Sequence, residues 1–155
     1  MASPGRAAAT EIAASAAGTI ALTPTPARVA LRPARDMDIA ARFAAAAAAD
    51  RHFILTLQGL ATDRPPRAGF LVFLNAPEGA TPSTEDAGYA GAVSFFDVPP
   101  RGEGARAVNF DVSDVLQRLR TAGRLGGAVI VTIQATAKPA AESHPTIDQI
   151  ALVEQ

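Results

Sequence analysis

The sequence predicts a mainly β fold, an antiparallel β-sandwich or barrel of about six to eight strands with one helical crossover over residues 112–122. Short apolar runs with a two-residue alternation recur along the chain, and clusters of Gly and Pro separate them. Only one segment has a clear helical period, and it lies between two of these runs. An α+β sheet with the helix on one face is the alternative that the pattern leaves open.

The chain of 155 residues has the length of one domain. Residues 1–17 are small, alanine-rich and without a period, so we expect a disordered linker there and a single β-sandwich-like domain over 18–155. Glu11 interrupts the apolar stretch that a secretion signal would need, and no run of large apolar residues reaches the length of a membrane span. The compartment therefore stays unknown, with the cytoplasm favoured.

The first strands are expected within 18–33, as two short strands or one interrupted edge strand. Apolar residues alternate there on both sides of a Thr-Pro-Thr-Pro break. Residues 36–50 combine high helix propensity with acidic residues at the start. The apolar face of this helix is limited to Met37, Ile39 and Phe43, so we expect it to be short and to pack weakly.

The strongest strand signals come after this helix. A run that is apolar on both faces, 69–75, is typical of a central strand between two layers. The full set of later strands is expected at 52–60, 69–75, 89–96, 106–110, 128–137 and 146–155.

The one clear helix is expected in the sequence DVSDVLQRLRTAG, which begins at Asp111. Its apolar residues fall at i, i+3, i+4 and i+7, namely Val112, Val115, Leu116 and Leu119. Asp111 is the expected N-cap, with Asp114 three residues later as an imperfect capping box. Gly123 suits the C-terminal end.

Known catalytic and metal-binding patterns are missing from the sequence. There are no cysteines, which excludes disulfides, thiolate metal sites and a cysteine nucleophile. The two histidines, His52 and His144, belong to no HxxxH or HExxH array, and no GxSxG motif occurs. We therefore predict no catalytic residue, no metal ligand and no cofactor in this chain, and we predict that it is not an enzyme.

The charge pattern also limits the partners. The formal net charge of −1 gives no field that attracts nucleic acid or an anionic membrane, so neither is an expected partner.

Phe95 and Phe96 are adjacent on an expected strand and should face opposite sides of it. Either both are covered, or one projects together with the loop that follows. The candidates for partner contact are Phe95, Phe96, Asp97, Val98, Pro99 and Pro100.

Several blocks in order carry a family resemblance: HFILTLQGLATDRPPRAGFLVFLNAPEGATP, YAGAVSFFDV, VNFDVSDVLQRLRTAGRL, VIVTIQAT and TIDQIALV. Together they resemble the C-terminal domain of bacterial tyrosinase and polyphenol oxidase family proteins, over about 18–153. Plant relatives carry a Lys-Phe-Asp-Val signature, and its counterpart here is the structural motif Asn109, Phe110, Asp111 and Val112.

The resemblance implies a β-sandwich or barrel that packs on a helical type-3 copper domain. There it shields the active-site entrance and modulates the latency or stability of an enzyme that oxidises monophenols and o-diphenols. The six copper-binding histidines belong to that other domain, so copper is implied only for a partner, in cis or in trans. The implied role of this chain is that of a non-catalytic accessory domain that covers the entrance with its 89–106 region, with Phe96 as the preferred plug.

One departure concerns the loop after the double Phe, PPRGEGARA, which has no histidine where bacterial relatives often have several. A free-standing β-sandwich module that binds a carbohydrate or a protein is the alternative function. Its sugar-binding form lacks support, because the chain has no Trp and only one Tyr for a stacking platform. A third reading, a small metalloenzyme, would need metal in the purified protein.

Overall fold

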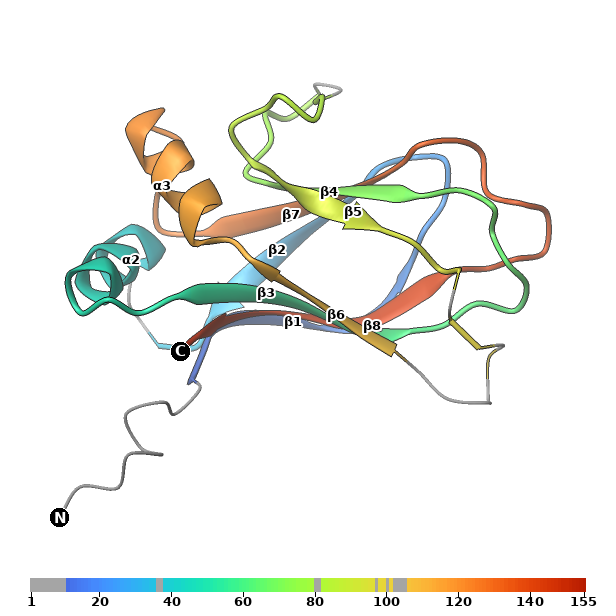
Figure 1. The fold of residues 1–155 in the computed structure, drawn as a ribbon, viewed down its shortest axis with the longest axis horizontal. Coiled ribbons are helices and arrows are strands. Elements are labelled where there is room, and N and C mark those ends of the chain that lie inside the picture. Colours follow the sequence, from blue (N-terminus) through green and yellow to red (C-terminus); the bar gives the residue numbers. More distant parts are fainter. Residues whose placement is uncertain (1–10, 36–37, 80–81, 97, 100, 102–105) are drawn as a thin grey trace, which may run out of the picture.

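The computed structural model describes residues 11–35, 38–79, 82–96, 98–99, 101 and 106–155. In this part of the chain, eight antiparallel strands form one sheet that curls into a nearly closed barrel, as Figure 1 shows, so the predicted mainly β class is confirmed. The strands are β1 (Glu11–Ala21), β2 (Ala27–Pro33), β3 (Phe53–Leu60), β4 (Phe70–Leu74), β5 (Tyr89–Val93), β6 (Arg106–Asp111), β7 (Val129–Ala135) and β8 (Thr146–Glu154). Two helices complete it, α2 (Ile39–Ala48) and α3 (Ser113–Thr121).

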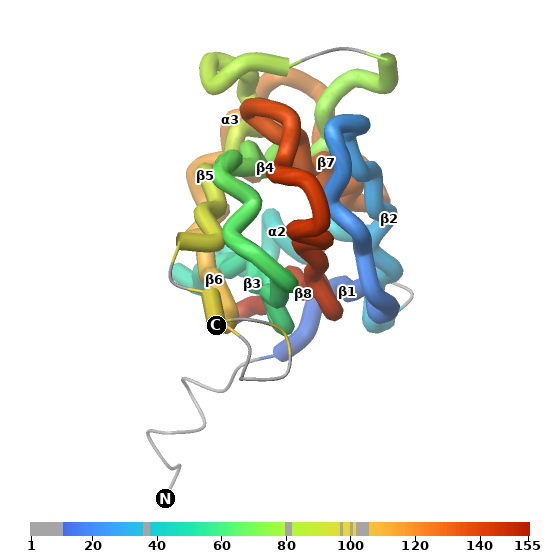
Figure 2. Tube along the Cα trace, turned by 90° about the vertical axis from the view of Figure 1, so that its right-hand side faces the viewer, coloured from blue at the N-terminus to red at the C-terminus, as the bar shows by residue number. Residues whose placement is uncertain are grey.

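The strand order is β5-β4-β7-β2-β1-β8-β3-β6, and every neighbouring pair is antiparallel. Successive connections therefore alternate between the two ends of the barrel. We call one the helix end, because both helices lie there together with the C-terminus (Figure 1). The other is the loop end, formed by the connections 22–26, 61–69, 94–105 and 136–145. Figure 2, viewed from the loop end, shows the strands arranged around a common axis.

The first strand corrects the expected linker over 1–17. β1 begins at Glu11 and pairs with β8 from its first residue, with Ala14 opposite Leu152. Ala13 and Ala14 are 1% and 0% exposed, so these small side chains belong to the core. The prediction of disorder is therefore wrong for residues 11–17, and residues 1–10 lie outside the described part of the chain.

The helix at 39–48 also packs more closely than its sequence predicted. Its residues Ile39 and Phe43 are 0% and 4% exposed, and the Phe43 ring lies 5.8 Å from that of Phe53 in β3. Arg42, on the same helix, is 7% exposed and binds two carboxylates. Its Nη2 lies 2.9 Å from Glu11 Oε2, and its Nε lies 2.7 Å from Glu154 Oε1. This bridge holds α2 against the first and last strands.

The crossover helix differs slightly from the prediction. α3 begins at Ser113 with Val112 as its N-cap, so the prediction that Asp111 is the N-cap is wrong by one residue. Asp111 still serves the helix start, because its Oδ1 accepts a hydrogen bond from the Ser113 backbone N–H at 3.0 Å. The Val112 side chain is fully buried and has no atom that could accept a hydrogen bond from the helix N–H groups, so it does not cap the helix itself. Gly123 follows the helix with φ of +72°, as a helix C-terminus favours.

Candidate functional site

The two edge strands of the sheet, β5 and β6, face each other across an open seam. No strand pairing joins them in the described part of the chain, and side-chain packing closes the gap instead. Gly91 in β5 has φ of +155°, and a Cβ added to it would lie 2.5 Å from Cε1 of Phe110 in β6. The Phe110 ring therefore lies against the bare backbone of Gly91. The connection between these two strands, 94–105, carries all six predicted contact residues.

The Asn-Phe-Asp-Val motif has a structural role at each position. Asn109 Oδ1 accepts a hydrogen bond from Thr56 Oγ1 at 2.8 Å, across the β3–β6 pair. Phe110 covers the seam, Asp111 receives the first N–H of α3, and Val112 fills the core below the helix. The motif thus joins the edge strand to the helix.

The double Phe lies just beyond the end of β5, because the chain leaves the sheet after Val93 and not after Phe96 as predicted. Phe95 is 2% exposed, and its ring meets that of Phe70 edge-on at 5.6 Å. Phe96 is 89% exposed. Of the two readings of this pair, the structure favours the one in which a single ring projects. Whether that ring contacts a partner stays a prediction.

The backbone around Phe96 forms a tight turn. The Val98 N–H donates to the Phe95 carbonyl at 3.1 Å, and the Phe96 N–H donates to Ser94 Oγ at 3.1 Å. Val98 is half-buried and packs against the core, and Pro99 is half-buried as well. The two remaining contact candidates, Asp97 and Pro100, lie outside the described residues.

Arg101 anchors the far side of this loop to two neighbouring connections. Its backbone N–H donates to the Thr62 carbonyl at 2.8 Å. Its side chain reaches Asp63 Oδ1 at 2.8 Å and the His144 carbonyl at 2.6 Å. His144 Nδ1 lies 2.9 Å from the other Asp63 oxygen. The hydrogen bonds from Arg101 and then His144 hold the pKa of Asp63 below its ordinary value.

A groove of about 420 Å³ opens beside the exposed Phe96 at the loop end. Its lining is mainly apolar and consists of Pro65, Pro66, Arg67, Ala68, Gly69, Ser94, Phe95, Phe96 and Thr136. Hydrogen bonds hold its two walls together: the Ala140 N–H donates to the Pro66 carbonyl at 2.7 Å, and the Thr136 N–H donates to the Gly69 carbonyl at 2.9 Å. None of the groove residues 65–69 was among the predicted contact candidates, although the double proline at 65–66 is visible in the sequence.

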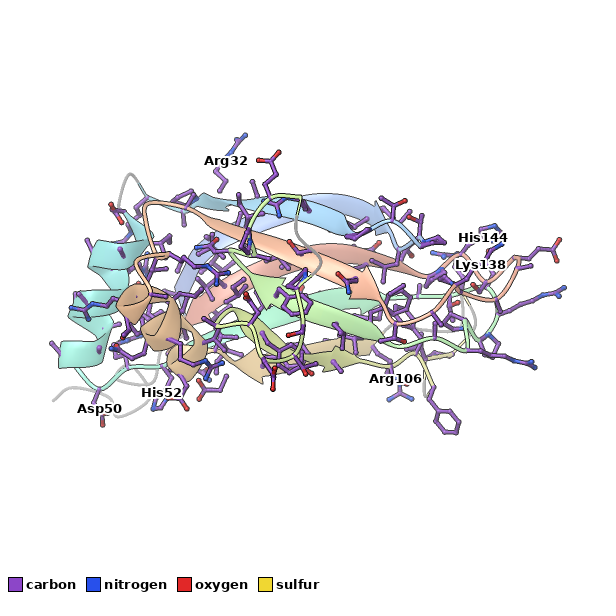
Figure 3. All side chains as sticks on the ribbon, turned by 90° about the horizontal axis from the view of Figure 1, so that it is seen from above. Arg32, Asp50, His52, Arg106, Lys138 and His144 are labelled. Atoms are coloured by element: carbon purple, nitrogen blue, oxygen red, sulfur yellow. The ribbon has the colours of Figure 1, made fainter. Side chains whose placement is uncertain are left out.

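The two histidines lie far apart, at opposite ends of the barrel, as Figure 3 shows. At the helix end His52 Nδ1 lies 3.2 Å from Asp111 Oδ2, and at the loop end His144 is held by Asp63. The described residues contain no group of three or more side chains that could hold a metal ion. These residues therefore do not fit a type-3 copper centre. Within the same residues, no helix is long and apolar enough to cross a membrane.

Comparison with solved structures shows the same fold in part of larger proteins. The structure of latent apple tyrosinase matches with a TM-score of 0.57 and 16% identity, over 88% of this chain and 27% of that chain. Recombinantly expressed latent aurone synthase, a polyphenol oxidase, matches with a TM-score of 0.53 and 15% identity, over 86% and 24% of the two chains. The same enzyme from its natural source matches at 0.51 and 20% identity, over 83% and 24%.

This chain thus spans about a quarter of the length of those proteins. At such identities the likeness is one of fold, and it confirms the resemblance to the C-terminal domain of the tyrosinase and polyphenol oxidase family at that level. A search of curated proteins found no match. A family model matches residues 9–155, nearly the whole sequence, and the chain therefore belongs to the family described as Domain of unknown function (DUF7868).

Proposed function

We propose that this domain is a non-catalytic shield for a tyrosinase-like copper domain, present in cis or in trans. In this function the loop end covers the entrance of the copper site and inserts Phe96, which keeps the oxidase latent. The observation that carries the proposal is the near-complete exposure of one Phe ring, 89%, on a hydrogen-bonded turn. The likeness in fold to latent oxidases supports it.

Exposure of this ring stabilises nothing inside the domain. Transfer of a Phe side chain from water to an apolar pocket contributes about 1.5–3 kcal/mol. The Phe96 and Val98 N–H groups donate to Ser94 Oγ and to the Phe95 carbonyl, so the chain beside the ring is already held and less conformational entropy is lost when the ring is buried. A ring presented in this way is suited to fill a pocket of a partner.

The experiment uses a fusion in which this chain replaces the matching C-terminal quarter of latent apple tyrosinase. A protease site is placed in the linker, and oxidation of an o-diphenol is measured before and after cleavage and removal of the domain. Tethering raises the effective concentration of the domain to the millimolar range, so even weak shielding would be detected. We expect lower activity before cleavage than after it.

Phe96→Ala should remove much of this latency without unfolding the domain, because the ring is almost wholly in solvent. Ile12→Ala is the matched control. Ile12 is the other large hydrophobic residue exposed in the described part of the chain, at 47%, and it lies in β1 near the helix end. Equal activity before and after cleavage would refute the proposed function, and equal effects of the two substitutions would refute the role of Phe96.

A further inference from the structure

Four neighbouring strands, β1, β8, β3 and β6, share an outward side that carries few charges. Leu55 in β3 and Leu152 in β8 point into the core with 0% exposure, so the residues next to them along each strand point outward. The register across the strands places these outward residues in rows, which we call the outer face: Ile12, Val153, Ile54 and Asp111; Ser15, Ala151, Thr56 and Asn109; and Ala17, Gln149, Gln58 and Ala107. Among them, Asp111 alone is charged.

Charges of both signs border the outer face. Arg32 of β2 lies beside Ser15 at one side, and Asp111 lies at the opposite side, on β6. Toward the loop end follow Asp148, which is exposed on β8, and Arg106, the first residue of β6. The glutamates at the helix end of β1 and β8 bind an arginine of α2 instead. All residues of the four strands are described, and their charges on this side balance once Arg32 is included.

The opposite side of the barrel also has outward residues, and there the chain covers them. Phe73 in β4 and Thr132 in β7 are paired and lie outside the central core cluster, yet they are only 0% and 3% exposed. The connection between β4 and β5 lies over this side in Figure 1, and Arg28 of β2 donates to the Ala76 carbonyl in it at 3.2 Å. The outer face instead keeps an open hollow of about 480 Å³ between β3, β6 and β8, and Ile12 at its border is 47% exposed. Uncharged, partly apolar surfaces of this kind are typical of contacts with protein.

We propose that the outer face binds a second copy of this chain across a two-fold axis that runs parallel to the strands, between β8 and β3. Such an axis places β8 of each copy over β3 of the other, as in two aligned sheets that pack face to face. The register then pairs like with like: Ile54 packs on Val153 of the other copy. Gln58 lies opposite Gln149, and each amide has both donors and acceptors for the other.

The borders of the face support this choice of axis. An axis parallel to the strands brings the β6 side of one copy to the β2 side of the other, so Asp111 and Arg32 lie on the same side of the dimer with opposite charges. An axis at right angles to the strands would place Ile54 over Gln58 instead, apolar against amide. A surface without net charge offers a different protein no charge pattern to recognise, whereas it is compatible with its own copy.

The size of the outer face predicts a weak dimer. The strands β1, β8, β3 and β6 have 11, 9, 8 and 6 residues. At the usual spacings of a sheet they present about 19 by 28 Å, or about 500 Å² for each copy. Two such faces bury about 1,000 Å², which is the lower end for a specific interface, so association should be reversible.

The dimer would present both loop ends in the same direction, because an axis parallel to the strands leaves each end of the barrel where it is. Two Phe96 rings would then project side by side. The inference itself does not rest on the shielding function, since the outer face and the loop end are separate surfaces. At the nanomolar concentrations of an activity assay the weak dimer dissociates, so the fusion experiment tests shielding alone.

Sedimentation velocity of the full chain tests the dimer. We expect a monomer at about 1 µM and a growing share of dimer toward about 1 mM, the range of weak interfaces. Ile54→Glu should raise the dissociation constant at least about tenfold, because it places a carboxylate of each copy in the apolar row. Ile12→Glu, at a more exposed position of the same row, should act in the same direction, and urea unfolding of both variants shows that they are folded.

Phe96→Ala is the matched control, because Phe96 is also a large exposed hydrophobic residue but lies at the loop end. It should leave the dissociation constant unchanged. A parent chain that stays monomeric up to about 1 mM would overturn the proposal. A dimer lost in Phe96→Ala but kept in both Glu variants would also overturn it, since the copies would then meet at the loop end. Loss of latency in an Ile54→Glu fusion, with a monomeric parent chain, would assign the outer face to a different protein.

Discussion

The seam between β5 and β6 can be tested by the substitution Gly91→Ala. The new Cβ would lie 2.5 Å from Phe110 Cε1 and 2.7 Å from Cδ1, well inside van der Waals contact. Overpacking of this kind costs about 1–3 kcal/mol. The φ of +155° adds backbone strain that a side chain does not tolerate well, of order 1 kcal/mol or more. We expect the free energy of unfolding to fall by about 2–4 kcal/mol.

A double-mutant cycle separates the clash from the strain. Phe110→Ala alone should cost about 1–2 kcal/mol, because the ring is half-buried. In the double variant the clash is gone, so its destabilisation should be smaller than the sum of the single effects by about 1–3 kcal/mol. The assay is urea unfolding followed by far-UV circular dichroism, since the chain has no Trp.

Gly126→Ala is the control for this cycle. A Cβ at Gly126 meets nothing within 4 Å, so the change should be neutral or slightly stabilising. If Gly91→Ala left the stability within about 0.5 kcal/mol of the parent, or if the two single effects were additive, Phe110 would not close the barrel through Gly91.

Three further predictions concern the contacts that hold the ends of the barrel. Arg42→Ala should lower the free energy of unfolding in urea by about 2–4 kcal/mol, because it removes one of the two arginine partners of the largely buried Glu154. An unchanged midpoint of urea unfolding would contradict this. Asp63 has a pKa held below its ordinary value of 3.8 by Arg101 and His144, so the stability it contributes is complete above about pH 4 and is lost as the pH falls through its folded pKa. The difference in unfolding midpoint between the parent and Asp63→Asn should therefore shrink on acidification, and a constant difference would disprove the linkage. Asn75→Ala should lower the free energy of unfolding by about 2–3 kcal/mol, measured by thermal unfolding. It removes the side-chain hydrogen bonds to the Arg124 carbonyl at 2.9 Å and from the Ile130 N–H at 2.8 Å. It also places Ala at a residue whose φ is +51°, a conformation that Ala adopts at a cost. Asn75→Gly, which tolerates this φ, should recover part of that loss.

The strands with large apolar side chains could be predicted from the sequence, whereas the alanine-rich one could not. Runs such as 53–60 and 70–74 carry alternating or continuous apolar residues, and both occur where expected. Residues 13–17 are all Ala or Ser, and such small side chains give no two-residue pattern. Their strand depends on pairing with β8, whose partner residues lie more than 130 positions away in the sequence. Local sequence patterns do not contain that information.

The candidate site was predictable only in part, for a related reason. The double Phe and the prolines after it indicated a projecting ring, and Phe96 does project. The anchor and the groove come from three separate connections, 61–69, 94–105 and 136–145, which meet only after the barrel has formed. The role of Phe110 was hidden as well, since its contact with Gly91 crosses a seam without strand pairing.

Because the connections alternate between the two ends of the barrel, a protein joined ahead of β1 is attached at the opposite end from Phe96. The chain enters the barrel at Glu11 at the helix end, whereas Phe96 follows the end of β5 at the loop end. The 11 residues of β1 span roughly 35 Å at the usual rise of an extended strand. For Phe96 to reach a protein joined ahead of β1, the linker between that protein and β1 must run this length along the outside of the barrel. That takes about ten extended residues or more. Shortening the linker below that span should abolish contact in cis while leaving the surface itself unchanged.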